Sequence, residues 1–118
     1  MRALAALAKE PNMSLIATAA KPADRPVLIT LCGDSGMGKT SLAASFPKPI
    51  FIRAEDGMQA IPANKRPDAF PLLSSAKDLW AQLGAVIHEP HDYQTLVIDS
   101  VTALERLFVA EVLEQDPK

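Results

Sequence analysis

A glycine-rich loop, Gly-Asp-Ser-Gly-Met-Gly-Lys-Thr at residues 33–40, constrains the fold more than any other part of the sequence. The run before it, residues 27–32, is apolar or β-branched throughout and predicts a strand that is buried on both faces. The run after it, residues 38–46, favours a helix that ends before Pro47. The sequence therefore predicts a strand, a tight loop and a helix in immediate succession.

The loop fits the pattern G-x-x-x-x-G-K-[ST] at every fixed position, a match that chance gives less than about 1 % of the time in this length. Glycine lets a loop turn its N–H groups onto phosphate oxygens, and the first amides of the next helix point at the same anion. Lys39 would add its charge at the β- and γ-phosphates, and the Thr40 hydroxyl is a ligand that suits Mg²⁺.

We therefore interpret the loop as a P-loop that binds a nucleoside triphosphate with Mg²⁺, against the alternative of an accidental glycine-rich turn. Two of its side chains, those of Asp34 and Ser35, receive no role of their own. The predicted binding residues are Gly33, Asp34, Ser35, Gly36, Met37, Gly38, Lys39, Thr40 and Ser41.

Two further strands are expected at residues 50–53 and 95–99, and two further helices at residues 75–88 and 101–114. Residues 54–73 contain three prolines and should be mostly loop. Strands that alternate with helices imply right-handed crossovers, and hence a parallel sheet with helices on its faces in a three-layer α/β/α arrangement. Ligands of such sheets bind beyond the carboxyl ends of the strands, so the P-loop should meet the residues that follow the two later strands.

Asp99 ends the strand at residues 95–99, which is the Walker B pattern. A carboxylate at that place can hold Mg²⁺, usually through water, opposite the Thr40 hydroxyl. The alternative is that Asp99 or Ser100 only caps the last helix, for which both residue types are suited. Because a P-loop precedes it, we predict that Asp99 is a metal ligand together with Thr40.

The candidate general base is Glu55, which lies two residues past the strand at residues 50–53. In many P-loop ATPases a glutamate directly follows the Walker B aspartate, but here that residue is Ser100. A neighbouring strand end can carry a base to the γ-phosphate from the side, where it positions a water. The alternatives are a solvated acidic loop, or Asp56 in the same role. We predict Glu55 and Lys39 as the catalytic residues.

Composition adds few constraints. The net charge of −2 gives no sign of a nucleic-acid-binding surface, and no run approaches the roughly 18 apolar residues that span a membrane. The single cysteine, Cys32, excludes an internal disulfide, indicates a reducing, cytosolic setting and should be buried in its apolar run. Trp80 lies on the apolar stripe of the helix at residues 75–88 and is expected to be a core anchor.

The segments Phe-Ile-Arg-Ala-Glu at residues 51–55 and Leu-Val-Ile-Asp-Ser-Val-Thr-Ala-Leu at residues 96–104 resemble the RecA-type recombinase core. The resemblance is strongest to phage-encoded RecA-like ATPases linked to single-strand annealing and recombination, which residues 38–49 and 66–68 also resemble. It covers roughly residues 26–110. It implies a RecA-like P-loop NTPase fold in which Lys39 and Thr40 serve phosphate and Mg²⁺, Asp99 serves Mg²⁺, and Glu55 activates water.

The same resemblance implies ATP and Mg²⁺ as cofactors, hydrolysis coupled to DNA recombination or annealing, and the cytoplasm of a bacterium or phage-infected host as the compartment. It implies single-stranded DNA as a partner of the full-length parent and allows an oligomer, with no membrane involved. The prolines at residues 11 and 22 indicate that residues 1–25 form an irregular or weakly helical leader, in which Met13 could be the translation start. Residues 26–118 would then be the N-terminal part of the NTPase domain.

In RecA-like proteins a later strand inserts between the P-loop strand and the Walker B strand. We therefore expect an unpaired slot between these two strands and a chain that is incomplete at its C-terminus. Alternatively, the two strands pair directly, as in the kinase and GTPase branch. On the last helix, Leu107, Val109 and Leu113 should be exposed, towards a missing layer or an oligomer contact.

Two other functions remain open. The first is a P-loop kinase of a nucleotide or small molecule. Such enzymes need a lid with arginines, and the only arginine after the third strand is Arg106, inside a helix, so this signal is missing. The second is a module that binds nucleotide without turning it over.

Overall fold

The computed structural model describes residues 14–116, so expectations about residues 1–13, including a start at Met13, lie outside the described part. The chain divides into two units, Met1–Thr30 and Leu31–Lys118. In the described part of the first unit, the only helical segment is the short 3-10 helix η2 (Ile16–Thr18), and residues 14–30 are exposed. The predicted boundary between leader and domain after residue 25 stays a prediction.

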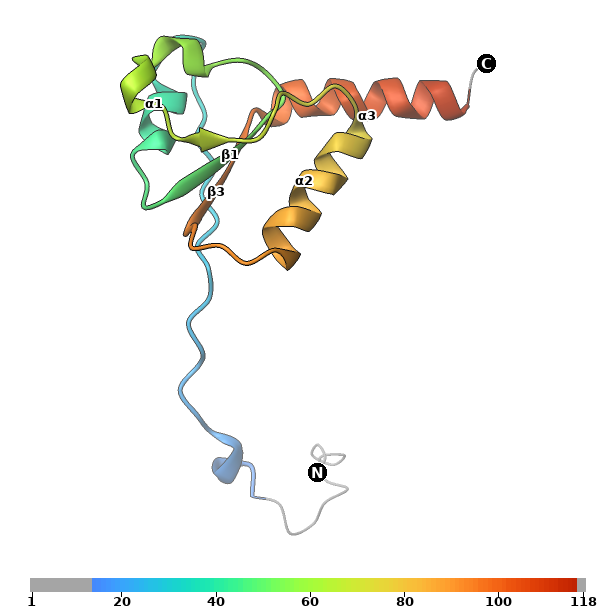
Figure 1. Cartoon of the computed structure of the whole chain (residues 1–118). Coiled ribbons are helices and arrows are strands. Elements are labelled where there is room, and N and C mark those ends of the chain that lie inside the picture. Colours follow the sequence, from blue (N-terminus) through green and yellow to red (C-terminus); the bar gives the residue numbers. More distant parts are fainter. Residues whose placement is uncertain (1–13, 117–118) are drawn as a thin grey trace. The chain divides into compact units, whose positions relative to one another are not determined.

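The second unit contains one open sheet of parallel strands with helices on it (Figure 1). Within residues 31–116 the strand order is β2-β1-β3, so the second strand in sequence lies at one edge and the first lies in the middle. This confirms the predicted α/β class and is consistent with a P-loop NTPase fold. The elements are α1 (Lys39–Ala44), β1 (Pro49–Arg53), η3 (Met58–Ala60), η4 (Ala63–Lys65), β2 (Asp68–Ala69), α2 (Ala76–His88), β3 (Thr95–Asp99) and α3 (Val101–Gln115).

Strand β1 is the centre of the core, because its successive side chains point to opposite faces of the sheet. Ile52 is fully buried and packs with Leu79 of α2 and Leu104 of α3. Phe51 is also fully buried and packs on the other side with Ala43 of α1 and with Met58. The two faces of β1 are therefore covered by different helices, as the predicted three-layer arrangement requires.

The predicted strand at residues 27–32 is wrong in this structure, because no strand is assigned there. Val27 and Leu28 are more than four-fifths exposed, at 82 % and 94 %, and Cys32 is exposed rather than buried. A strand needs a neighbour that takes its backbone hydrogen bonds, and none of the described strands pairs with this run. Direct pairing of this run with β3, as in kinases and GTPases, is not present in the sheet of the described residues.

Strand β3, which was predicted at these residues, is only half-buried. Leu96 and Ile98 point to one face and are 39 % and 38 % exposed. Within the described residues β3 pairs with β1 alone, and no other strand pairs with its second edge. The expected slot lay between this strand and one at residues 27–32, and because no strand is assigned there the slot stays a prediction. Apolar side chains on that side of the sheet then have too few neighbours to bury them.

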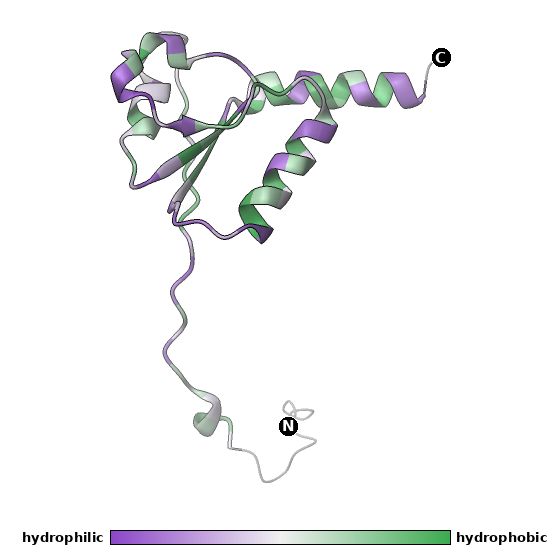
Figure 2. Ribbon diagram, in the orientation of Figure 1, coloured by the Kyte–Doolittle hydropathy of each residue, from purple (hydrophilic) through white to green (hydrophobic). Residues whose placement is uncertain are grey.

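Helix α3 carries exposed apolar residues along its length, visible as recurring green in Figure 2. Val109 and Leu113 are 52 % and 64 % exposed, as predicted, whereas Leu107 packs against the core around Ile52. Trp80 is not a core anchor, because it is 59 % exposed. Its ring lies 6.0 Å from that of Phe108, which is itself only partly buried against the core. Among the helices of residues 14–116, none has both the length and the apolar character needed to cross a bilayer.

The short strand β2 was not predicted, because a two-residue strand between prolines has no periodicity. It is held partly by Tyr93, whose hydroxyl donates a hydrogen bond of 2.5 Å to Oδ2 of Asp68. Loss of the phenol proton would bring a second negative charge beside this carboxylate. The hydrogen bond to Asp68 therefore raises the pKa of Tyr93 above its usual value.

We predict that Tyr93 ionises above about pH 10, the usual value for tyrosine. Because the pKa is raised in the folded state, the contact stabilises the fold fully below about pH 10, and its contribution is lost as the pH rises through the raised pKa. Tyr93 is the only tyrosine, so the ultraviolet absorbance of the phenolate reports it alone. Asp68→Asn should move the midpoint back towards the usual value; equal midpoints in both proteins would contradict the prediction.

Candidate nucleotide-binding site

The phosphate loop has the backbone conformation that its glycines were expected to supply. Gly36 and Gly38 have φ of 83° and 90°, in the left-handed region that costs other L-residues about 1–2 kcal/mol. Gly38 is also the N-cap of α1, which begins at Lys39. The turn into the helix therefore depends on residues without a Cβ.

The side chain of Lys39 reaches back to the first residues of this loop. Its Nζ donates hydrogen bonds to the carbonyl oxygens of Gly33 at 2.6 Å and Asp34 at 2.9 Å. An ammonium group has three donors, so two hold the loop in shape while one remains for an anion. The predicted phosphate-binding charge is thus held at the loop by the loop itself.

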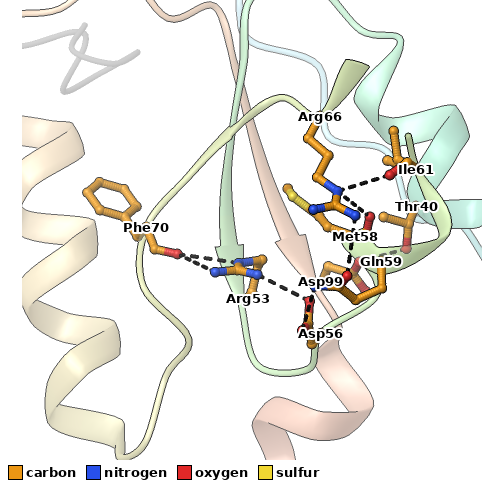
Figure 3. A network of polar contacts seen from close by, with 9 residues as sticks. All are labelled: Thr40, Arg53, Asp56, Met58, Gln59, Ile61, Arg66, Phe70 and Asp99. Carbon is orange, nitrogen blue, oxygen red and sulfur yellow. Dashed lines mark hydrogen bonds and ion pairs between the residues drawn. The ribbon is translucent and has the colours of Figure 1, made fainter. Parts of the chain in front are cut away.

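Thr40 and Asp99 meet although they are 59 residues apart in the sequence. The Thr40 hydroxyl donates a hydrogen bond of 2.7 Å to Oδ2 of Asp99, and both groups are partly buried (Figure 3). One oxygen comes from the first turn of α1 and the other from the carboxyl end of β3. The structure therefore brings together the two oxygens that were predicted to share a metal ion.

This pair fits Mg²⁺ by the chemistry of its donors, since a hydroxyl and a carboxylate are both hard oxygen ligands. Mg²⁺ is commonly held by one or two carboxylates together with substrate phosphates and water. Within residues 14–116 no larger group of His, Cys, Asp and Glu side chains could hold a metal by itself. The pair is suited to a metal ion that arrives with a nucleotide.

The segment Ala54–Gly57, called here the β1 arm, leaves the sheet directly beside Asp99, because Arg53 and Asp99 are register partners. The amides of Ala54 and Glu55 both donate to the carbonyl oxygen of Asp99, at 2.7 Å and 3.3 Å. The carboxyl ends of the two strands are thus joined by backbone hydrogen bonds just outside the ladder.

The side chain of Glu55 is turned towards the residue that follows Asp99. Oγ of Ser100 donates to Oε2 of Glu55 at 3.0 Å, while the same oxygen accepts the amide of Ala103 at 3.2 Å and caps α3. The peptide bond between Asp99 and Ser100 is cis. The Glu55 carboxylate thus lies next to Ser100 in space. Ser100 is the residue at which many P-loop ATPases have a glutamate, directly after the aspartate that ends the strand.

Asp56, the competing acid, has a different set of partners. Its carboxylate pairs with Nη1 of Arg53 at 3.3 Å and accepts Nε2 of Gln59 at 3.3 Å (Figure 3). Arg53 in turn donates to the carbonyl oxygen of Phe70. Asp56 thus ties the β1 arm to its surroundings, and Glu55 is the acid directed to Ser100.

Comparison with known sequences adds the family. The model of the AAA domain family matches residues 25–118, most of the chain. The chain belongs to this AAA domain family. Members are P-loop ATPase domains that generally bind ATP with Mg²⁺, which agrees with the loop and the Thr40–Asp99 pair. A search of curated proteins and a search of solved structures both returned no match.

Sequence reasoning about this AAA domain missed Gly57, the last residue of the β1 arm. A Cβ built on Gly57 would lie 2.9 Å from Oγ1 of Thr40 and 3.2 Å from Oδ2 of Asp99. The only signal in the sequence was a glycine placed just after two acids at a strand end. That signal is weak, because the closeness of Gly57 to Thr40 exists only in the folded chain.

Proposed function

We propose that this AAA domain binds ATP with Mg²⁺ through Gly33–Thr40 and Asp99 and hydrolyses the γ-phosphate bond, with Glu55 as general base. The observation that carries the proposal is the 2.7 Å hydrogen bond between Thr40 and Asp99. It joins the phosphate loop to the end of the Walker B strand, as a metal shared by both would require. Membership of the family supports the same activity.

In this proposal the loop recognises phosphate through backbone amides around Gly36 and Gly38 and through the charge of Lys39. Thr40 and Asp99 would hold Mg²⁺, and Ser41 would bind the nucleotide beside Thr40. When bound, Mg²⁺ neutralises charge on the β- and γ-phosphates. These residues stabilise charge and hold the substrate in line, which is most of what a phosphoryl-transfer site must do.

Glu55 acts on the attacking water. The Ser100 hydroxyl has one proton, and because its oxygen already accepts the amide of Ala103, that proton is directed to Oε2 of Glu55. Within the described residues the other oxygen, Oε1, has no hydrogen-bond partner, so it can accept a proton from water. Ser100 thus orients the base while it caps α3.

The first test concerns phosphate binding. Lys39→Ala removes the ammonium group, and a hydrogen bond to a charged group is worth about 1.5–3 kcal/mol, so the affinity for ATP with Mg²⁺ should fall tenfold or more. Calorimetry measures the change. Lys77→Ala, on the exposed side of α2, is the matched control and should bind like the wild type. Unchanged ATP binding by Lys39→Ala would end the proposal.

The second test separates the two acids of the β1 arm. Glu55→Gln should lower the turnover number by about 10²–10⁴ and leave ATP affinity unchanged, as expected for loss of a general base. Asp56→Asn should lower turnover far less, because Asp56 pairs with Arg53 and Gln59. Steady-state phosphate release measures both variants. Full turnover by Glu55→Gln would exclude it as the base, and ATP binding without turnover by the wild type would favour a binding module.

A finer proposal follows from the resemblance of residues 51–55 and 96–104 to phage RecA-like ATPases. On this view hydrolysis is coupled to recombination or single-strand annealing, with single-stranded DNA as partner, an oligomer as its assembly, and the cytoplasm of a bacterium or phage-infected cell as compartment. Single-stranded DNA should then increase the rate of ATP hydrolysis by the full-length protein. Normal turnover that DNA leaves unchanged would remove the finer proposal and leave the ATPase itself intact.

A further inference from the structure

We propose that Gly57 is a positioning residue of the metal site: its missing side chain keeps the space beside the Thr40 hydroxyl and the Asp99 carboxylate open for Mg²⁺. The inference rests on the proposed function and extends it to a residue outside the two nucleotide-binding motifs. It concerns only the part of ATP binding that depends on Mg²⁺. The contacts of the phosphate loop with ATP are not affected.

The space, and not the backbone, requires glycine here. Gly57 has φ of −84° and ψ of −9°, a conformation that any L-residue adopts. A Cβ at this residue would nevertheless lie 2.9 Å from Oγ1 of Thr40 and 3.2 Å from Oδ2 of Asp99. Gly36 and Gly38 show the opposite case, because both have positive φ and open space around a built Cβ. Gly57 therefore differs in kind from the glycines of the loop.

The β1 arm cannot easily move away to make room. On one side of Gly57, Asp56 is held by Arg53 and Gln59. On the other side, Met58 is 4 % exposed in the core beside Phe51. An added methyl group would therefore act on Thr40 and Asp99.

The next residues of the chain are also fixed. Nε of Arg66 donates to the carbonyl oxygens of Met58 at 3.0 Å and of Ile61 at 2.9 Å (Figure 3). A shift of Gly57 away from Thr40 would have to carry Met58 with it and would disturb these contacts.

The Thr40 side chain also cannot move away without losing its hydrogen bond to Asp99. This side chain is β-branched and stiff, and its hydroxyl already donates to Asp99 at 2.7 Å. A methyl group on residue 57 would push the two oxygens apart or cover them. Mg²⁺ demands near-ideal octahedral geometry, so displaced oxygens would lower the affinity for Mg²⁺. The loop amides and Lys39 would stay in place.

The experiment measures ATP affinity of the full chain by calorimetry, in Mg²⁺ and in EDTA, for the wild type and for Gly57→Ala. In EDTA the two affinities should agree within about twofold. In Mg²⁺ the affinity of Gly57→Ala should be lower by about tenfold or more, the range seen when groups around metal ligands are changed. Equal gains from Mg²⁺ in both proteins would overturn the inference.

Gly84→Ala is the matched control. Gly84 lies in α2, nothing lies within 4 Å of a built Cβ there, and the same methyl group should leave ATP binding unchanged under both conditions. If the wild type itself binds no ATP in Mg²⁺, the proposed function fails. If the wild type binds and Gly57→Ala responds to Mg²⁺ equally well, only the role of Gly57 fails.

Thermal unfolding of each variant guards against a misfolded protein. Should Gly57→Ala fail to fold, it is tested again in a Thr40→Ala background. That background lacks Oγ1 of Thr40, the atom that would lie 2.9 Å from a Cβ at residue 57. Thr40→Ala with Gly57→Ala should then fold and bind ATP in Mg²⁺ within about twofold of Thr40→Ala alone, because coupled residues are not additive. A further tenfold loss by the double variant in EDTA as well as in Mg²⁺, or its failure to fold, would show that Gly57 acts apart from the metal site and would overturn the inference.

Discussion

The parallel pairing of β1 with β3 is the constraint on which the candidate site depends. Because the strands run in the same direction and Arg53 lies opposite Asp99, the segments that follow the two strands leave the sheet at the same end. Residues separated by more than forty positions, such as Glu55 and Ser100, then come within hydrogen-bonding distance. An antiparallel pairing would have put the end of one strand beside the start of the other and separated these groups.

The Thr40–Asp99 hydrogen bond adds the phosphate loop to this edge. Among the described residues it is the one hydrogen bond between α1 and β3, whereas the apolar contact of α1 with the sheet is that of Ala43 with Phe51. Packing thus brings the helix to the sheet, and the polar pair sets the orientation of its first turn. The same two oxygens would then face a metal without any large rearrangement.

Much of this arrangement could be predicted from the sequence. The bounds of β1, α2, β3 and α3 differ from the predicted ones by no more than a residue or so, because each has clear periodicity and clear end signals. The predicted tight loop is present, with positive φ at Gly36 and Gly38. The meeting of Thr40 with Asp99 also followed from general rules for parallel sheets. The roles of these residues remain proposals.

The failures have a common physical cause. The run at residues 27–32 has strand-like residues, yet a strand exists only with a partner, and hydropathy cannot say whether one is present. Trp80 was expected in the core for the same reason, yet its side chain is 59 % exposed. A side chain is buried only when a second element covers it. A hydrophobic pattern in one element therefore cannot show whether its side chains are buried.

The sequence by itself determined the chemistry that is available: a phosphate loop with its lysine and threonine, an acid at the end of a strand, and another acid after the neighbouring strand. These depend on local geometry, which short runs of residues specify. The tertiary structure alone decided which acid is turned to Ser100, which acid is tied to Arg53, and that Gly57 lies against Thr40 and Asp99. Those outcomes depend on distances between segments far apart in the chain, and such distances are set only when the sheet and its helices pack together.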